Sequence, residues 1–274
     1  MTADPLLDEL TASLGSRREA AWVLEELEHT GVTDRRGRGL ELAARRRAGE
    51  PLQYLLGHWP FRSLDLLVDP RALIPRPETE QLVGLALEEL ARGQGPRVVC
   101  DLGCGTGAIA LCLAVEGTAA GLALDVHATD VDDDALDLAR VNAARSAAVV
   151  EFHRGSWYDA LPHSLEGRVH LICSNPPYVS ALERPGLGRE LDFEPELALV
   201  ARDGTEGTPG FGTVEEVVVG AARWLVPGGV LLVEHGEAQR AAALACAQRS
   251  GLVEGVDLDD LAGRPRVLRA VRPT

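Results

Sequence analysis

The spacing of apolar residues changes near residue 57, and the change predicts two kinds of structure. Before that point apolar side chains recur every three or four residues, as at Ala20, Val23 and Leu27, which is the period of an amphipathic helix. We therefore expect residues 1–57 to form a small helical domain. In residues 58–76 apolar positions mostly alternate, which predicts a β-hairpin linker.

From Pro77 onward short apolar segments alternate with helical patterns. This alternation predicts a doubly wound α/β domain over residues 77–274, built on a seven-stranded sheet with a parallel core. The expected strands are Val98–Asp101, Asp125–Asp130, Val149–His153, Val169–Ser174, Val230–Glu234, Val253–Leu258 and Val267–Val271. Ligands of such sheets lie at the carboxyl ends of strands, so polar residues directly after a strand are candidates for a site.

One strand end carries the tetrapeptide Asn175, Pro176, Pro177 and Tyr178. The two prolines fix φ at successive positions and remove two backbone donors, so nearby carbonyl groups have no competing N–H groups. The side-chain amide of Asn175 adds an acceptor and two donors, and Tyr178 adds an aromatic face. Together they can hold the NH2 of a planar amide or amino group. Taken alone, the motif is also compatible with an ordinary proline turn.

A glycine-rich turn follows the first of these strands and precedes an apolar helical stretch. Alternating glycines let the backbone approach a ligand closely, and the helix N-terminus offers free N–H groups. The spacing is Gly-x-Gly-x-Gly, whereas a dinucleotide fingerprint has Gly-x-Gly-x-x-Gly, so a nicotinamide-dependent oxidoreductase fits less well. The candidate cofactor-binding residues of this turn are Asp101, Gly103, Cys104, Gly105, Thr106 and Gly107.

The second strand of the predicted sheet ends in an acid, Asp130. An acid at this place in related α/β folds binds the hydroxyl groups of a ribose, and we assign Asp130 to that role. The acids that follow, Asp132 to Asp134, precede a helical pattern, and we expect them mainly to cap that helix.

Together these motifs resemble the class I S-adenosylmethionine-dependent methyltransferases, and among them the HemK/PrmC family of release factor glutamine methyltransferases. The resemblance covers nearly the whole chain and is most specific at Leu73–Glu80, with support from the glycine turn, Asn175–Tyr178 and Phe193–Pro195. It implies a Rossmann-like fold and transfer of a methyl group from S-adenosylmethionine to the N5 amide nitrogen of a glutamine. In the family this glutamine belongs to the Gly-Gly-Gln motif of peptide chain release factors, and S-adenosylhomocysteine is the second product.

The resemblance also implies roles for single residues. Asn175 and the carbonyl group of Pro176 would bind the glutamine amide, with Pro177 beside them and Tyr178 packed against it. This makes Asn175, Pro176 and Tyr178 the expected catalytic residues, and Asn175 would border the cofactor as well. Trp157, after the third strand, would lie near the adenine of the cofactor. The alternative for Trp157 is a core residue that covers the sheet edge.

One segment departs from the family pattern. In the family the N-terminal helical domain helps to engage the release factor, which implies that residues 1–57 dock the substrate here. Between Glu28 and Arg45, within this domain, the chain is shorter than is usual in the family. A divergent paralogue that methylates a glutamine in another protein therefore stays an alternative. The basic residues nearby, Arg35–Arg38 and Arg45–Arg47, form either a solvated helix face or a docking surface.

Charge narrows the substrate class. The chain has 274 residues and a formal net charge of −15, and all 27 basic residues are arginine. Because both predicted domains are acidic overall, we expect no stable binding to nucleic acid. An amino-methyltransferase acting on adenine or cytosine in DNA or RNA would use the same tetrapeptide, but the sequence has no target-recognition insertion and no basic groove. A non-catalytic binding protein is a further alternative, against which the intact tetrapeptide argues.

The remaining composition predicts a cytoplasmic enzyme without a membrane anchor. The sequence has no run of about 18 apolar residues and no basic segment followed by an apolar core at its start. Its five cysteines lack a paired Cys-x-x-Cys spacing, so we expect reduced core thiols and no metal site.

Overall fold

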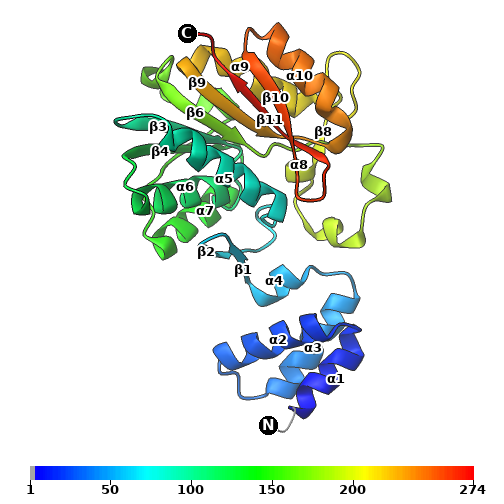
Figure 1. Ribbon diagram of the computed structural model, residues 1–274. Coiled ribbons are helices and arrows are strands. Elements are labelled where there is room, and N and C mark those ends of the chain that lie inside the picture. Colours follow the sequence, from blue (N-terminus) through cyan, green and yellow to red (C-terminus); the bar gives the residue numbers. More distant parts are fainter. Residues whose placement is uncertain (1–3) are drawn as a thin grey trace.

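The computed structural model describes residues 4–274 and divides them into a helical part and a larger α/β part (Figure 1). The helical part contains α1 (Pro5–Leu14), α2 (Arg17–His29), α3 (Arg35–Arg47) and α4 (Leu52–Leu56). The side chains of Asp4, Ser16 and Asp34 each accept a backbone N–H at the start of α1, α2 and α3. Leu10 and Leu27 are buried where these helices meet, and they give this part a core of its own.

A hairpin leads from the helices into the α/β part. Strand β1 (His58–Phe61) pairs antiparallel with β2 (Leu64–Leu67), and both lie between the two parts of the molecule in Figure 1. The buried side chains of Phe61 and Leu66 pack into the core of the α/β part. The exact domain boundaries at residues 57 and 76 stay a prediction.

The α/β part is built on a seven-stranded sheet in the order β10-β11-β9-β6-β3-β4-β5. Its strands are β3 (Arg97–Leu102), β4 (Leu124–Asp130), β5 (Glu151–Arg154), β6 (Val169–Ser174), β9 (Leu225–Glu234), β10 (Val253–Asp259) and β11 (Pro265–Val271). The strands from β9 to β5 run parallel, and β11 is antiparallel to both its neighbours. The predicted doubly wound fold with a parallel core is confirmed.

Helices cover both faces of the sheet. Successive side chains of β3 point to opposite faces of the sheet. Val99 packs on one face with α5 (Pro77–Ala91) and α6 (Ala108–Ala119), whereas Cys100 packs on the other with α9 (Gly212–Trp224) and α10 (Arg240–Arg249). Helix α7 (Asp133–Ser146) lies beside α6 and contacts β4 and β5. All five cysteines are buried and form no disulfide.

The sheet order reverses at β3, because the chain passes from β3 to β4 on one side and β6 lies on the other. The carboxyl ends of β3, β4 and β6 therefore open a crevice, the place where ligands bind in such folds. The segment after β6 covers this edge with β7 (Val179–Ser180), three short helices, η3 (Arg184–Gly186), η4 (Arg189–Phe193) and α8 (Glu196–Leu199), and β8 (Val200–Ala201). Among residues 4–274 no helix is both long and apolar enough to cross a membrane.

Candidate active site

A cavity of about 340 Å³ lies at the carboxyl ends of the central strands. Most of the predicted cofactor-binding residues line it, namely Gly103, Cys104, Gly105, Thr106, Asp130, Trp157 and Asn175. Motifs that are far apart in the sequence are thus brought to one inner cavity. Arg71 to Pro75, from the segment between the hairpin and α5, close its other side.

The glycine turn forms one wall of this inner cavity. Gly103 and Gly105 have φ values of 72° and 53°, in the region that favours glycine. The N–H groups of Gly103 and Cys104 donate to the carbonyl of Thr129, at 2.8 and 2.9 Å, and this anchors the turn to β4. A Cβ on Gly103 would lie 2.8 Å from the ring of Trp157, so only glycine lets the ring pack against the turn.

Asp130 connects the turn to the end of β4. One of its carboxylate oxygens accepts the N–H of Gly105 at 2.8 Å, and the other accepts the N–H of Asp132 at 3.0 Å. Burial raises the pKa of Asp130, and these two hydrogen bonds act in the opposite direction. Since each carboxylate oxygen can accept more than one hydrogen bond, Asp130 can still accept from hydroxyl groups in the cavity.

Two predicted residues of the turn do not line the cavity. The Asp101 carboxylate is fully buried, with Oδ2 accepting the N–H of Ala110 at 3.0 Å, and its Oδ1 has no hydrogen-bond partner within residues 4–274. Burial raises the pKa of Asp101 to about 7. Gly107 begins α6 with a φ of 85°, and a Cβ there would lie 3.0 Å from the side chain of Leu111. Both residues therefore lie on the side of the turn that faces α6, away from the inner cavity, and help to hold the turn in place.

A second, outer cavity of about 670 Å³ lies between the helical part and the tetrapeptide. Asn175, Pro176, Pro177 and Tyr178 line it together with residues of α3 and of the segment after β6. Asn175 and Pro177 line both cavities, so the tetrapeptide forms the wall between them.

The carbonyl groups of the tetrapeptide differ in their partners. The Pro177 carbonyl accepts the hydroxyl of Thr213, and the Tyr178 carbonyl accepts the side-chain amide of Gln239 at 3.1 Å. Within the described part of the chain the Pro176 carbonyl has no hydrogen bond. The prolines supply no N–H at 176 or 177. Position 176 therefore has an acceptor without a partner and no backbone donor beside it.

A buried hydrogen-bond network holds the tetrapeptide in place. The Asn175 side-chain amide nitrogen donates to the hydroxyl of Thr79 at 3.0 Å, and that hydroxyl donates to Glu234 at 2.7 Å. The Tyr178 hydroxyl donates to the other oxygen of Glu234 at 3.2 Å. Burial raises the pKa of Glu234, whose side chain has no contact with solvent. Because its nitrogen is taken, Asn175 presents its oxygen as the free acceptor.

Thr79 and Glu234 were missed as site residues by the sequence analysis. Both had a detectable signal, because Thr79 lies in the Leu73–Glu80 segment and Glu234 ends a predicted strand at the site edge of the sheet. A second link was also missed. The buried carboxylate of Glu194 accepts the N–H of Ile74 at 3.0 Å and pairs with Arg76 at 2.5 Å. Glu194 thus joins the Leu73–Glu80 segment to the Phe193–Pro195 motif beside the outer cavity.

Comparison with known proteins identifies the family. The family model "Methyltransferase small domain" matches residues 84–191. A protein of Bordetella pertussis named release factor glutamine methyltransferase is 39% identical over 271 residues, which is 97% of this chain and 96% of the relative. A protein of the same name from Deinococcus radiodurans is 42% identical, over 94% of this chain and 87% of the relative. This chain belongs to the release factor glutamine methyltransferase family. It is a methyltransferase, as predicted.

Solved structures agree on the fold. A methyltransferase from Pyrococcus furiosus matches with a TM-score of 0.54 and 18% identity, over 89% of this chain and all of that one. The catalytic domain of hMettl16, solved with an RNA hairpin, matches with a TM-score of 0.57 and 15% identity, over 88% of this chain and 80% of that one. At these identities the likeness concerns the fold alone.

The network makes a prediction about stability. Thr79→Val keeps the shape of the side chain but removes both hydrogen bonds, which leaves the buried carboxylate of Glu234 with one partner fewer. We expect the free energy of unfolding to fall by about 1–3 kcal/mol, as measured by urea denaturation. Thr118→Val, at an exposed position near the end of α6, is the matched control and should change it little. Equal stability of the two variants would contradict the network.

A second prediction concerns pH. The pKa of Asp101 is about 7 in the folded protein, against an ordinary 3.8, so Asp101 stays protonated to a higher pH in the folded than in the unfolded protein. The free energy of unfolding must then fall as pH rises between these values, and Asp101→Asn removes this contribution. From about pH 5.5 to about pH 8 we expect the variant to gain about 2 kcal/mol relative to the parent protein, at about 1.4 kcal/mol per pKa unit. Asp159→Asn, at an exposed position, should show no such gain.

Proposed function

We propose that this chain transfers a methyl group from S-adenosylmethionine to the side-chain amide nitrogen of a glutamine in a protein. The pair of cavities that meet at Asn175 and Pro177 carries this proposal. The inner cavity has the features of a nucleoside site, and the outer one is large enough to admit a peptide loop. The names of the relatives support a glutamine of a release factor as the target. The Gly-Gly-Gln motif of peptide chain release factors is the target that the family resemblance implies.

The residues of the inner cavity fit S-adenosylmethionine. The glycine turn brings backbone close to the cavity, and Asp130 offers acceptors for the ribose hydroxyl groups. Trp157 supplies a flat apolar wall for the adenine, and its ring is fixed because Nε1 donates to Glu216 at 2.8 Å. In this proposal Trp157 therefore borders the cofactor and is not only a core residue.

S-adenosylmethionine supplies an electrophilic methyl group on its sulfonium. An amide nitrogen is a weak nucleophile, so the protein has to align it and to stabilise the positive charge that it gains. The free oxygen of Asn175 and the unpaired Pro176 carbonyl are the two acceptors that would hold the target NH2. Such alignment contributes up to about 7–11 kcal/mol to the lowering of the barrier. Because the acceptors are already fixed, little rearrangement opposes the reaction.

The helical part would help to bind the protein substrate. Arg46 of α3 lines the outer cavity and pairs with Glu19 at 2.9 Å and with Glu190 of the segment after β6 at 2.7 Å. These pairs link the helices to the edge of the cavity that faces the tetrapeptide. We propose that a release factor binds across this junction in the cytoplasm, without stable contact to nucleic acid.

The amide-holding role can be tested with Asn175→Ala. Turnover of a release factor should fall by a factor that corresponds to at least about 2.7–4 kcal/mol in the barrier, because the lost contact strengthens in the transition state. Affinity for S-adenosylmethionine should change little. The measurement is transfer of a labelled methyl group, with the modified residue located by mass spectrometry. Near-normal methylation by this variant would refute the role of Asn175, and a label on adenine, cytosine or another protein would redirect the substrate assignment.

The cofactor site can be tested with Gly105→Val. The new side chain would point toward the inner cavity from a backbone conformation that costs of order 1–3 kcal/mol for a residue other than glycine. We expect calorimetry to detect no binding of S-adenosylmethionine. Gly251→Val is the control, because Gly251 has a φ of 77° and open space around it, so it meets the same strain far from the site. Unchanged affinity of Gly105→Val would exclude the glycine turn from the cofactor site.

A further inference from the structure

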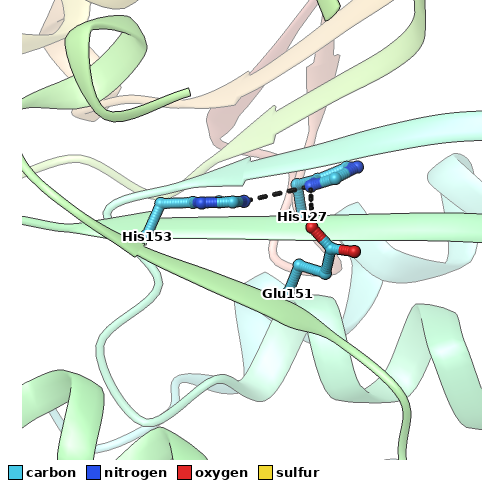
Figure 2. Close-up of side chains that lie close together, drawn as sticks. All are labelled: His127, Glu151 and His153. Carbon is cyan, nitrogen blue, oxygen red and sulfur yellow. Dashed lines mark hydrogen bonds and ion pairs between the residues drawn. The ribbon is translucent and has the colours of Figure 1, made fainter. Parts of the chain in front are cut away.

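A cluster of side chains outside both cavities joins the edge strand to its neighbour. His127 of β4 and His153 of β5 point toward each other, and Glu151 lies beside His127 on the same side of the strands (Figure 2). Nδ1 of His127 is 3.0 Å from Nε2 of His153 and 3.5 Å from a carboxylate oxygen of Glu151. None of the three residues lines the inner or the outer cavity.

Without an ion the contacts of His127 conflict in either neutral tautomer. Its Nε2 lies 3.4 Å from a carboxylate oxygen of Asp125 yet has no hydrogen bond within residues 4–274. A proton on Nδ1 leaves the Nε2 lone pair against Asp125. A proton on Nε2 leaves the Nδ1 lone pair against Glu151. In both cases a lone pair of the His127 ring faces a carboxylate. Water can do little to relieve this repulsion, because the His127 side chain is only 5% exposed.

A cation at Nδ1 removes the conflict. The lone pairs of His127, His153 and Glu151 would then all point at the ion, and Nε2 of His127 would carry its proton toward Asp125. In metal sites a carboxylate commonly orients a ligating histidine in this way, and Asp125 would take that role once the ion fixes the proton on Nε2. Ligands at about 2.0–2.2 Å in a tetrahedral site lie roughly 3.3–3.5 Å from one another. The 3.5 Å between Nδ1 of His127 and Glu151 matches this, and the 3.0 Å between the two histidine nitrogens would widen when an ion binds.

We propose that His127, Glu151 and His153 bind a divalent transition metal of the zinc class, with water as the fourth ligand. Two imidazoles and one carboxylate are a donor set that suits Zn²⁺ or Co²⁺ rather than Mg²⁺ or Ca²⁺. The ion would tie β5 to β4, and β5 leads directly into the segment with Gly155 and Trp157 that borders the inner cavity. Its role would be to brace this edge, separate from methyl transfer.

The test uses the full, untagged chain after treatment with a chelator, with Co²⁺ as the probe. We expect one Co²⁺ per chain with the visible absorption of a four-coordinate centre, displaced by one equivalent of Zn²⁺. His153→Ala and Glu151→Gln should each weaken binding at least tenfold and abolish the rise in the thermal midpoint that Zn²⁺ causes. Both positions are at least partly exposed, so these variants spare the buried His127.

The control is His163→Ala, which removes an exposed histidine and should bind Co²⁺ as the parent protein does. Absence of a bound metal in the parent protein would overturn the proposal and leave a pair of histidines that share a proton. Binding that survives both His153→Ala and Glu151→Gln would also overturn it, because the ion would then lie elsewhere. Neither result depends on methyltransferase activity, so the proposed function is tested separately.

Discussion

One carboxylate without access to solvent fixes the wall between the two cavities. Glu234 ends β9, and its two oxygens accept the hydroxyl groups of Thr79 and Tyr178. Removing a charge from water costs several kcal/mol unless hydrogen bonds or charges compensate, so these partners are required by the burial itself. Thr79 comes from the first turn of α5, and Tyr178 from the segment after β6. The need to satisfy one acid therefore draws three distant segments together.

The same network decides which atoms remain for a ligand. Because Thr79 occupies the nitrogen of Asn175, the oxygen of that amide is left free, and the adjacent prolines leave the Pro176 carbonyl free as well. In the proposed function both acceptors would be held before a substrate binds. Such a site would act through fixed dipoles, with little reorganisation during the reaction. The buried polar contacts behind the wall are thus as important as the residues that face the cavity.

The sequence predicted what depends on local pattern and not what depends on contact between distant segments. Seven strands, the glycine turn and Asp130 follow from periodicity and from residues next to strand ends. The bond between Thr79 and Asn175 joins residues 96 positions apart, and only the folded sheet brings them together. Asp101 was predicted to bind the cofactor as part of the glycine-turn motif, and this stays a prediction. Since side chains alternate along β3, its carboxylate points beneath the turn toward α6, which the sequence motif alone does not indicate.

Charge around the outer cavity is partly compensated. Of the four arginines that line this cavity, Arg46 pairs with Glu19 and Glu190, and Arg76 pairs with Glu194. The other two, Arg47 and Arg189, have no ion pair within residues 4–274. The basic cluster of α3 therefore offers less free positive charge than its sequence indicates. A glutamine side chain is neutral and is recognised by donors and acceptors, so it gains nothing from a strong field. The ion pairs of Arg46 join the helical part to this cavity, and in the proposed mechanism the selectivity for an amide would come from the two acceptors of Asn175 and Pro176.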